Sequence, residues 1–387
     1  MENVKKDRMF IFLAVMSIAS TLGFQAWRTL FNNYAVEVVG LGGNHIGMIQ
    51  SIREIPGFLA LLVVFVTLVI KEHRLSALSI AVLGAGVSLT GFFPTYTGLI
   101  FTTLLMSFGF HYFETTNQSL TLQYFDKHTS PWVMGKLRSY SALSAIVIGS
   151  VILVATSYLS YTVMFAILGS LVIGAGIWGA LQNPTRDDVV PQQKKMILRK
   201  RYSLYYFLTF MAGARRQIFV AFAVFLLVEK FQFSIKEITL LFMLNNAINY
   251  FLSPLIGKAI IRFGERKVLS VEYFSLIFIF IAYAVVDTKA IVAVLYILDH
   301  IFFNFSMGIR TFFQKIGDPD HMAPTMAVGF TINHIAAVVI PVLGGLAWIV
   351  DYRIPFIAGA VMSLISLMAV QYISRNLQFA ELRHTNK

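Results

Sequence analysis

A histidine and a glutamate lie one helical turn apart in a segment that is otherwise strongly apolar. The segment SFGFHYFETTNQS, residues 107–119, places His111 and Glu114 at positions i and i+3, which share one face of an α-helix. Such a pair can bind and release a coupling proton, or it can neutralise a buried arginine. Its nitrogen and carboxylate groups would also suit a divalent transition metal if His300 and His334 converge with it. The sequence leaves these three roles open.

Other ionisable and amide side chains interrupt apolar segments along the whole chain. Guanidinium groups match the geometry of carboxylates and phosphates, and buried acids and imidazoles can carry protons. The candidates to bind a substrate are Arg28, Arg53, Arg215, Arg216, His300, Asn304, Asn333 and His334. The candidates to carry a coupling proton are His111, Glu114, Glu54 and Asp299. The alternative is that the arginines and the acids neutralise one another in pairs between helices.

The composition shows which class of protein carries these residues. Of 387 residues, 57% are hydrophobic and only 13% are charged, whereas soluble domains carry about a quarter charged residues. The mean hydropathy is +0.72. Cysteine is absent from the sequence, which excludes disulfides, thiol catalysis and thiolate metal sites. These values predict an integral membrane protein.

Apolar segments long enough to cross a bilayer recur along the chain. Twelve spans are predicted, numbered here in chain order: 9–38, 46–70, 75–93, 98–124, 136–156, 162–181, 203–228, 237–257, 268–286, 290–313, 323–348 and 354–374. The polar segment 183–202 falls at the midpoint. We therefore predict an all-α membrane protein with an N-terminal six-helix half (1–182), a cytoplasmic linker (183–202) and a C-terminal six-helix half (203–387).

Lysine and arginine residues gather in alternate connections between the spans. Basic residues mark the cytoplasmic side of membrane proteins, so both termini are expected in the cytoplasm, with the chain in a bacterial inner (plasma) membrane. The net charge of +12 then reflects topology, and no nucleic-acid partner is expected. The acidic segment DPDH, 318–321, falls in one of these connections and is expected to be a loop that ends a helix rather than a metal cluster.

The charged residues within the spans follow a pattern. Each ionised group at mid-membrane costs about 2.5–3.5 kcal/mol even on a lenient scale, so these groups must face one another or a wet cavity. They avoid spans 3, 6, 9 and 12; Glu272 in span 9 lies about one turn from its cytoplasmic end. At about 1.5 Å per residue, most of the set lies near the bilayer midplane, where transporter sites occur. In span 2, the adjacent Arg53 and Glu54 cannot share one helix face and Pro56 should bend the helix, so a salt bridge to span 1 or 11 is expected.

One loop carries a recognisable motif. The segment GKAIIRFGERK, 257–267, resembles the loop signature Gly-x-x-x-Asp-Arg-x-Gly-Arg-Arg of the major facilitator superfamily through Gly257, Arg262, Gly264 and Arg266. The acidic position holds Ile261, and the equivalent loop of the first half keeps little more than basic residues. The arrangement of twelve predicted spans as two six-helix halves also resembles this family.

The resemblance implies a central cavity lined by spans 1, 4, 7 and 10 and alternating access by rocking of the two halves. We therefore expect a secondary transporter of a small anionic or zwitterionic solute that is driven by the proton gradient. The sequence contains no phosphate-binding loop of the kind that would indicate direct use of ATP. The alternatives are a proton-coupled exporter of cationic or amphipathic compounds or of a divalent transition metal, and, less favoured, an intramembrane enzyme. No cofactor is expected; the expected partners are the solute, protons and lipid, and the chain is expected to be a monomer.

Overall fold

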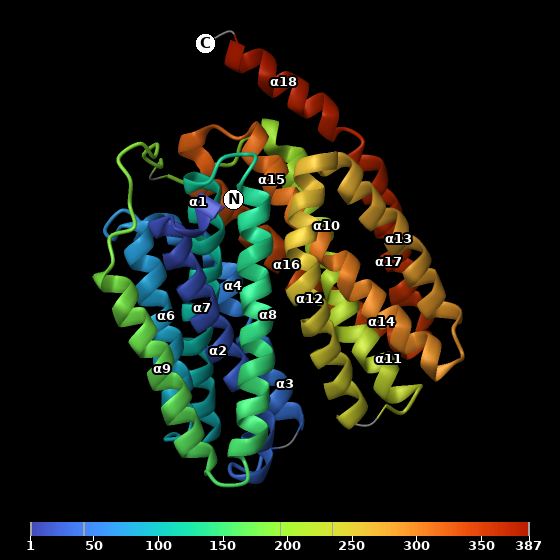
Figure 1. The fold of residues 1–387 in the computed structure, drawn as a ribbon. Helices are drawn as coiled ribbons and strands as arrows, with labels where there is room; N and C mark the ends of the chain where they lie inside the picture. Colours follow the sequence, from blue (N-terminus) through green and yellow to red (C-terminus); the bar gives the residue numbers. More distant parts are fainter. Residues whose placement is uncertain (1, 42, 194, 234, 386–387) are drawn as a thin grey trace. The chain divides into compact units, whose positions relative to one another are not determined.

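The computed structural model describes residues 2–41, 43–193, 195–233 and 235–385, which are helical along most of their length (Figure 1). No β-strand occurs among these residues, so the predicted all-α class is confirmed. The chain folds as two compact units.

Unit 1 comprises Met1–Tyr124, Leu137–Ile197 and Asp320–Thr331. It holds most of α8 (Ser130–Ala155) and the start of α16 (Met322–Val350), which follows the short turn η5 (Pro319–His321). Its other helices are α1 (Glu2–Lys5), α2 (Arg8–Glu37), α3 (Gly43–Ile52), α4 (Ile55–Phe58), η1 (Leu59–Leu62), α5 (Val63–Val66), α6 (Glu72–Thr90), α7 (Tyr96–Tyr124) and α9 (Tyr161–Leu181). Within this unit α2, α6, α7 and α9 pack alongside one another (Figure 1).

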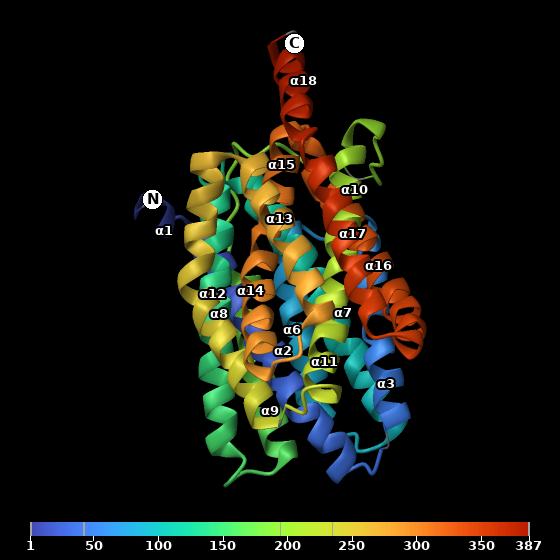
Figure 2. The same cartoon turned by 90° about the vertical axis from the view of Figure 1, so that its right-hand side faces the viewer.

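Unit 2 comprises Phe125–Lys136, Leu198–Pro319 and Ile332–Lys387. It contains the first residues of α8 and the rest of α16. Its other helices are η2 (Lys200–Tyr202), α10 (Ser203–Gln217), the π-helical η3 (Ile218–Ala223), α11 (Val224–Glu229), α12 (Ile235–Phe263), α13 (Glu265–Val285), α14 (Lys289–Phe303), η4 (Asn304–Ser306), α15 (Met307–Ile316), α17 (Arg353–Val370) and α18 (Ile373–Thr385). Here α13 packs against α14, α15 and α17 (Figure 2). The division into halves at residues 183–202 stays a prediction.

The helices account for the twelve predicted spans. Eleven helical segments of the described chain are long and apolar enough to cross a membrane. The remaining predicted span is α7, a continuous helix of 29 residues that is less apolar because it carries His111, Glu114 and several amide and hydroxyl groups. The helix that the sequence singled out is therefore also the one that hydropathy alone identifies least clearly.

Hydrogen bonds at the helix ends and glycines along the helices fix the packing of unit 1. The Asp7 carboxylate accepts hydrogen bonds from the backbone N–H groups of Met9 and Phe10, at 2.8 and 3.3 Å, and so caps α2. Along α6 and α9, Gly84 and Gly169 allow the two backbones to approach closely, as small residues do between membrane helices. In unit 1, α6 and α9 thus pack tightly together, and α2 and α7 pack against them.

Three spans change helix type part-way across. In span 2, α3 ends at Ile52 and α4 begins at Ile55, next to Pro56. In span 7, α10 passes into the π-helical η3 directly after Gln217, and in span 10, α14 passes into η4 at Asn304. Each change lies at or beside a polar residue predicted for the site. Irregular segments of this kind often mark functional positions in helices.

We predict that Gly169→Ala destabilises the protein by about 1–3 kcal/mol, the usual cost of overpacking. A Cβ at this position of α9 would meet the backbone of Ser88 and Gly84 on α6 well inside van der Waals contact. Gly174→Ala on the same helix is the matched control, because a Cβ there has no neighbour within 4 Å. Thermal unfolding in detergent should give a lower midpoint for Gly169→Ala only. Equal midpoints for the two variants would contradict the close packing of α6 and α9.

Candidate functional site

The break in span 2 brings two consecutive charged side chains together. Between α3 and α4, the Arg53 guanidinium forms an ion pair with the Glu54 carboxylate, and Arg53 Nε donates to Gln50 Oε1 at 3.1 Å. The side chains of Arg53 and Glu54 are 20% and 22% exposed. The sequence analysis looked for partners on other spans and missed this contact. Neighbouring side chains diverge in a regular helix, but here the helix ends and lets them meet.

An aromatic row connects this ion pair to the histidine of α7. The Arg53 guanidinium lies 5.6 Å from the ring centroid of Phe24, which stacks on Phe110 at 4.4 Å. The Phe110 ring in turn lies 5.1 Å from the ring of His111 in an edge-on arrangement. A carboxylate oxygen of Glu54 lies within 4.8 Å of a ring nitrogen of His111. Unit 1 therefore gathers a guanidinium, a carboxylate and an imidazole around two phenylalanines.

The C-terminal half of α2 carries a polar stripe beside this group. Its side chains are exposed or half-buried, and they are Gln25, Arg28, Thr29, Asn32 and Asn33. Two hydrogen bonds run along the stripe, from Gln25 to Thr29 at 3.1 Å and from Asn33 to Glu37 at 2.9 Å. Charged and amide groups are costly against hydrocarbon, so this face of α2 is suited to line water. Of the four candidate arginines, Arg28 is the exposed one, whereas Arg53 and Arg216 are half-buried and Arg215 is buried.

The two residues that first drew attention to α7 differ in exposure. His111 is 3% exposed, and its backbone carbonyl accepts a hydrogen bond from the Thr115 hydroxyl at 2.9 Å. Glu114 is half-buried one turn further along. Threonine hydroxyls on α7 thus bond to carbonyls of their own helix, which satisfies polar atoms in an apolar setting. A coupling role for His111 and Glu114 stays a prediction.

Arg215 lies inside unit 2, with 3% of its surface exposed. Its Nη2 lies 3.8 Å from Oε1 of Glu272 on α13, and its Nη1 donates to the hydroxyl of Ser366 on α17. The guanidinium also lies 4.3 Å from the ring centroid of Tyr273. Arg215 is therefore buried, and its guanidinium contacts side chains of α13 and α17.

A small cavity lies among these buried charges. The cavity volume available to the centre of a water molecule is about 10 Å³. This is roughly the volume that one bound water requires. Its polar lining consists of Arg215, Glu272, Asp299 and Ser306, and its apolar lining includes Phe219 and Phe303. Both acids are 2% exposed. The cavity is thus lined by charged groups and has about the size of a single solvent molecule.

A second polar network lies on another face of α14. The Asn249 Nδ2 atom on α12 lies 2.6 Å from His300 Nε2, and Asn304 Nδ2 donates to Asn249 Oδ1 at 2.5 Å. Asn304 also donates to the carbonyl oxygen of His300 at 2.8 Å, just where η4 begins. Two of the predicted site residues, His300 and Asn304, therefore share one hydrogen-bond network with Asn249 of span 8.

The remaining predicted residues of unit 2 lie on α10 and α16. Arg216 is half-buried beside Arg215. Asn333 Nδ2 donates to the carbonyl oxygen of Thr209 at 3.2 Å, and His334 is 2% exposed. Substrate contacts by these residues stay predictions.

The loop that resembles the family signature is built around two glycines. Gly264 caps α13 with φ of 79°, a conformation that favours glycine. A Cβ on Gly257 would clash with the backbone of Pro131 at the start of α8. Arg262 and Arg266 are exposed. Close packing thus accounts for Gly257 and backbone conformation accounts for Gly264. A role for this loop in conformational change stays a prediction.

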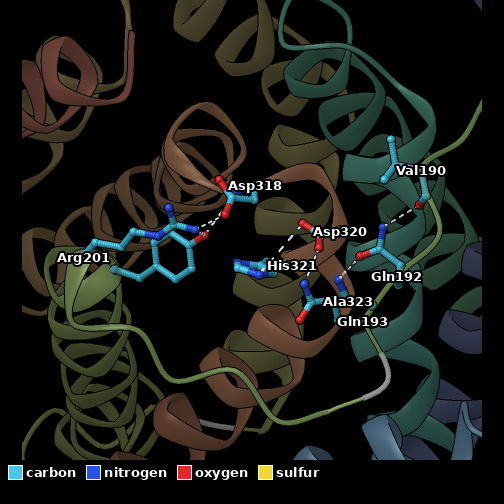
Figure 3. A network of polar contacts seen from close by, with 9 residues as sticks. Val190, Gln192, Gln193, Arg201, Asp318, Asp320, His321 and Ala323 are labelled. Carbon is cyan, nitrogen blue, oxygen red and sulfur yellow. Dashed lines mark hydrogen bonds and ion pairs between the residues drawn. The ribbon is translucent and has the colours of Figure 1, made fainter. Parts of the chain in front are cut away.

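The acidic residues of DPDH bind side chains of the linker and of η2 (Figure 3). In unit 2, the Asp318 carboxylate forms an ion pair with Arg201. In unit 1, the Asp320 carboxylate accepts a hydrogen bond from the Gln193 side chain, and the Asp320 carbonyl accepts one from the Gln193 N–H at 2.8 Å. Both carboxylates therefore have protein partners, which favours the loop interpretation over a metal cluster.

Sequence reasoning overlooked two parts of this arrangement. Glu272 was assigned to the cytoplasmic end of span 9, but α13 begins at Glu265, so Glu272 lies about two turns inside the helix. The amides of α2, including Asn32 and Asn33, were not among the predicted site residues. Their spacing on the same face as Arg28 is a signal that could have identified them.

The comparisons with known proteins agree with this fold. The family model of the Major Facilitator Superfamily matches residues 9–341, and the chain belongs to this family. It is thus a transporter rather than an enzyme, and an integral membrane protein. A search of curated protein sequences finds no significant match.

Several solved structures share the fold at low sequence identity. The human organic anion transporter TETRAN matches with a TM-score of 0.75 and 10% identity, over 94% of this chain and 99% of that one. The E. coli fucose:proton symporter FucP matches with a TM-score of 0.74 and 11% identity, over 94% and 98%. A bacterial homologue of the iron transporter ferroportin, in an outward-facing state, matches with a TM-score of 0.69 and 13% identity, over 95% and 99%.

We predict that Asn249→Ala lowers the stability of the protein by about 1–3 kcal/mol, the cost of removing a hydrogen-bond partner from buried polar groups. The variant loses the contacts with His300 and Asn304 that join α12 to α14 and η4. Asn246→Ala is the matched control, because that side chain bonds to the carbonyl of Phe242 on its own helix. Thermal unfolding should separate the two variants, and equal effects would show that the network does not hold α12 to α14.

Proposed function

We propose that this transporter carries a small anionic or zwitterionic solute by alternating access, together with a proton. The observation that carries the proposal is that Arg28 is an exposed residue within the polar stripe of α2. A guanidinium binds a carboxylate through two parallel charge-assisted hydrogen bonds, and the neighbouring amides offer both donors and acceptors. A face of this kind fits a solute with a carboxylate and further polar groups.

The balance of charge within the predicted spans supports a link between the anion and a proton. The groups to be counted are four arginines, Arg28, Arg53, Arg215 and Arg216, and four acids, Glu54, Glu114, Glu272 and Asp299. The count from the sequence left out Glu272 and gave a surplus of one positive charge. With Glu272 included, the ionised groups balance to zero. One proton on an acid then restores the positive charge that favours an anion.

Features of the fold and two structural relatives support the rest of the proposal. Spans 2, 7 and 10 are irregular next to polar residues, as in transporters whose broken helices form binding sites. One relative is described as an organic anion transporter and another as a fucose:proton symporter. The alternate placement of basic residues favours cytoplasmic termini, and we place the protein in a bacterial inner membrane.

A divalent transition metal is the second candidate cargo. The observation that favours it is the approach of Glu54 and His111 within 4.8 Å, since carboxylate and imidazole ligands suit such ions. One structural relative is described as a homologue of an iron transporter. Uptake of Mn²⁺ or Co²⁺ into proteoliposomes that is lost in both His111→Ala and Glu54→Gln, without any carboxylate exchange, would replace the anion proposal with this one.

We predict that Arg28→Gln lowers the exchange of carboxylates by about 10- to 100-fold, because a hydrogen bond to a charged group contributes about 1.5–3 kcal/mol. The measurement is exchange of labelled solutes in proteoliposomes, screened over mono- and dicarboxylates and amino acids. Arg28→Lys should keep part of the activity because it keeps the charge. Arg375→Gln, on the exposed face of α18, is the control. Undiminished exchange in Arg28→Gln would remove Arg28 from the binding site.

A further inference from the structure

The charged cavity of unit 2 contains atoms whose hydrogen-bonding capacity is not used. Oδ2 of Asp299 is buried and accepts no hydrogen bond from any residue that the structure describes. Across the same cavity, Nη2 of Arg215 donates no hydrogen bond within the described chain, and its nearest carboxylate oxygen, on Glu272, is 3.8 Å away. A buried carboxylate oxygen without a donor is expensive. The cavity therefore requires something that satisfies these atoms.

The charge of the cluster indicates what is missing. One guanidinium faces two carboxylates, so the cluster carries one negative charge if both acids are ionised. Among the described residues, the phenols of Tyr273 and Tyr283 on α13 also lie beside it, and phenols are neutral near pH 7. On α14, the neighbouring His300 is turned toward Asn249, and α17 contributes the hydroxyl of Ser366. No second cation among the described residues faces the cavity, and one proton would make it neutral.

The geometry also fits a solvent molecule. Polar groups separated by more than 3.5 Å are commonly bridged by water, and the distance from Arg215 to Glu272 is 3.8 Å. A buried water needs two to four polar partners and a cavity of roughly 10–15 Å³. The cavity provides about 10 Å³, with Ser306 as a further polar group on its wall.

We propose that Asp299, Glu272 and Arg215 form an internal proton-binding site in unit 2, with the proton on Asp299 and one water between the three side chains. The proton forms an O–H bond on Asp299, and Arg215 remains the counter-ion of Glu272. The use of this site in coupling rests on the proposed function. The site is distinct from the polar stripe of α2, and it gives Arg215 the role of a positioning residue instead of a ligand of the solute.

Infrared difference spectroscopy of the purified protein near pH 7 tests the site directly. Wild type minus Asp299→Asn should show the carbonyl band of a protonated carboxylic acid. A difference that contains carboxylate bands and no protonated carboxyl band would overturn the proposal. Asp287→Asn is the matched control, because Asp287 is an exposed residue of the same unit that pairs with Lys230; its spectrum should keep the Asp299 band.

A second variant tests whether the charge of Glu272 keeps the proton on Asp299. This test is informative even if the Asp299→Asn variant fails to fold. In Glu272→Gln, Arg215 faces a single carboxylate, so Asp299 should stay ionised and its protonated band should be lost although Asp299 is unchanged. A purely structural role for Glu272 would leave that band in place, which would overturn the account of one proton shared by the cluster.

Transport assays separate this proposal from the proposed function. With a carboxylate that the wild type exchanges, Asp299→Asn should reduce accumulation driven by a pH gradient to simple equilibration. If the wild-type flux ignores the pH gradient but the infrared band is lost in Asp299→Asn, the coupling fails and the proton site stands. If the wild-type flux follows the pH gradient but the infrared band is unaffected by Asp299→Asn, the proton binds elsewhere and the site is overturned.

Discussion

The cost of placing charge in hydrocarbon governs the arrangement of polar groups in both units. Each ionised side chain at membrane depth costs a few kcal/mol, and breaking one partner out of a buried pair costs about 3–5 kcal/mol. Unit 1 meets this constraint by pairing Arg53 with Glu54, and unit 2 meets it by placing Arg215 between Glu272 and Asp299. Arg28 is exposed on a polar face of α2, and in the proposed function it is the group that binds the anion.

The same constraint links helix geometry to transport. The ion pair between consecutive residues in span 2 requires the break between α3 and α4, and the network of Asn304 with His300 coincides with the start of η4. Polar side chains and irregular backbone therefore occur together. An irregular segment leaves backbone groups without their helical hydrogen bonds, and a polar side chain such as Asn304 can bond to them. In the proposed function, the buried acids take up one proton and Arg28 binds one anion. A proton and a monoanion that cross the membrane together carry no net charge.

The sequence predicted the fold well because hydropathy belongs to each segment separately. It identified the twelve spans, and it identified α7 as the helix whose polar residues needed explanation. It could not predict that Arg53 meets Glu54, because that contact depends on where α3 ends. It missed Glu272 because depth was counted from an assumed start of span 9, and α13 begins three residues earlier. Nor could it decide which of Arg215 and Arg216 is buried, because that depends on how α10 is rotated against α13 and α17.

The most direct test of this account measures which force drives accumulation by the wild-type protein. In proteoliposomes, a pH gradient and a membrane potential are imposed one at a time while uptake of an exchanged monocarboxylate is followed. The account predicts accumulation that follows the pH gradient and is indifferent to the potential, because one proton and one monoanion together carry no charge. Accumulation that follows the potential and ignores the pH gradient would contradict it.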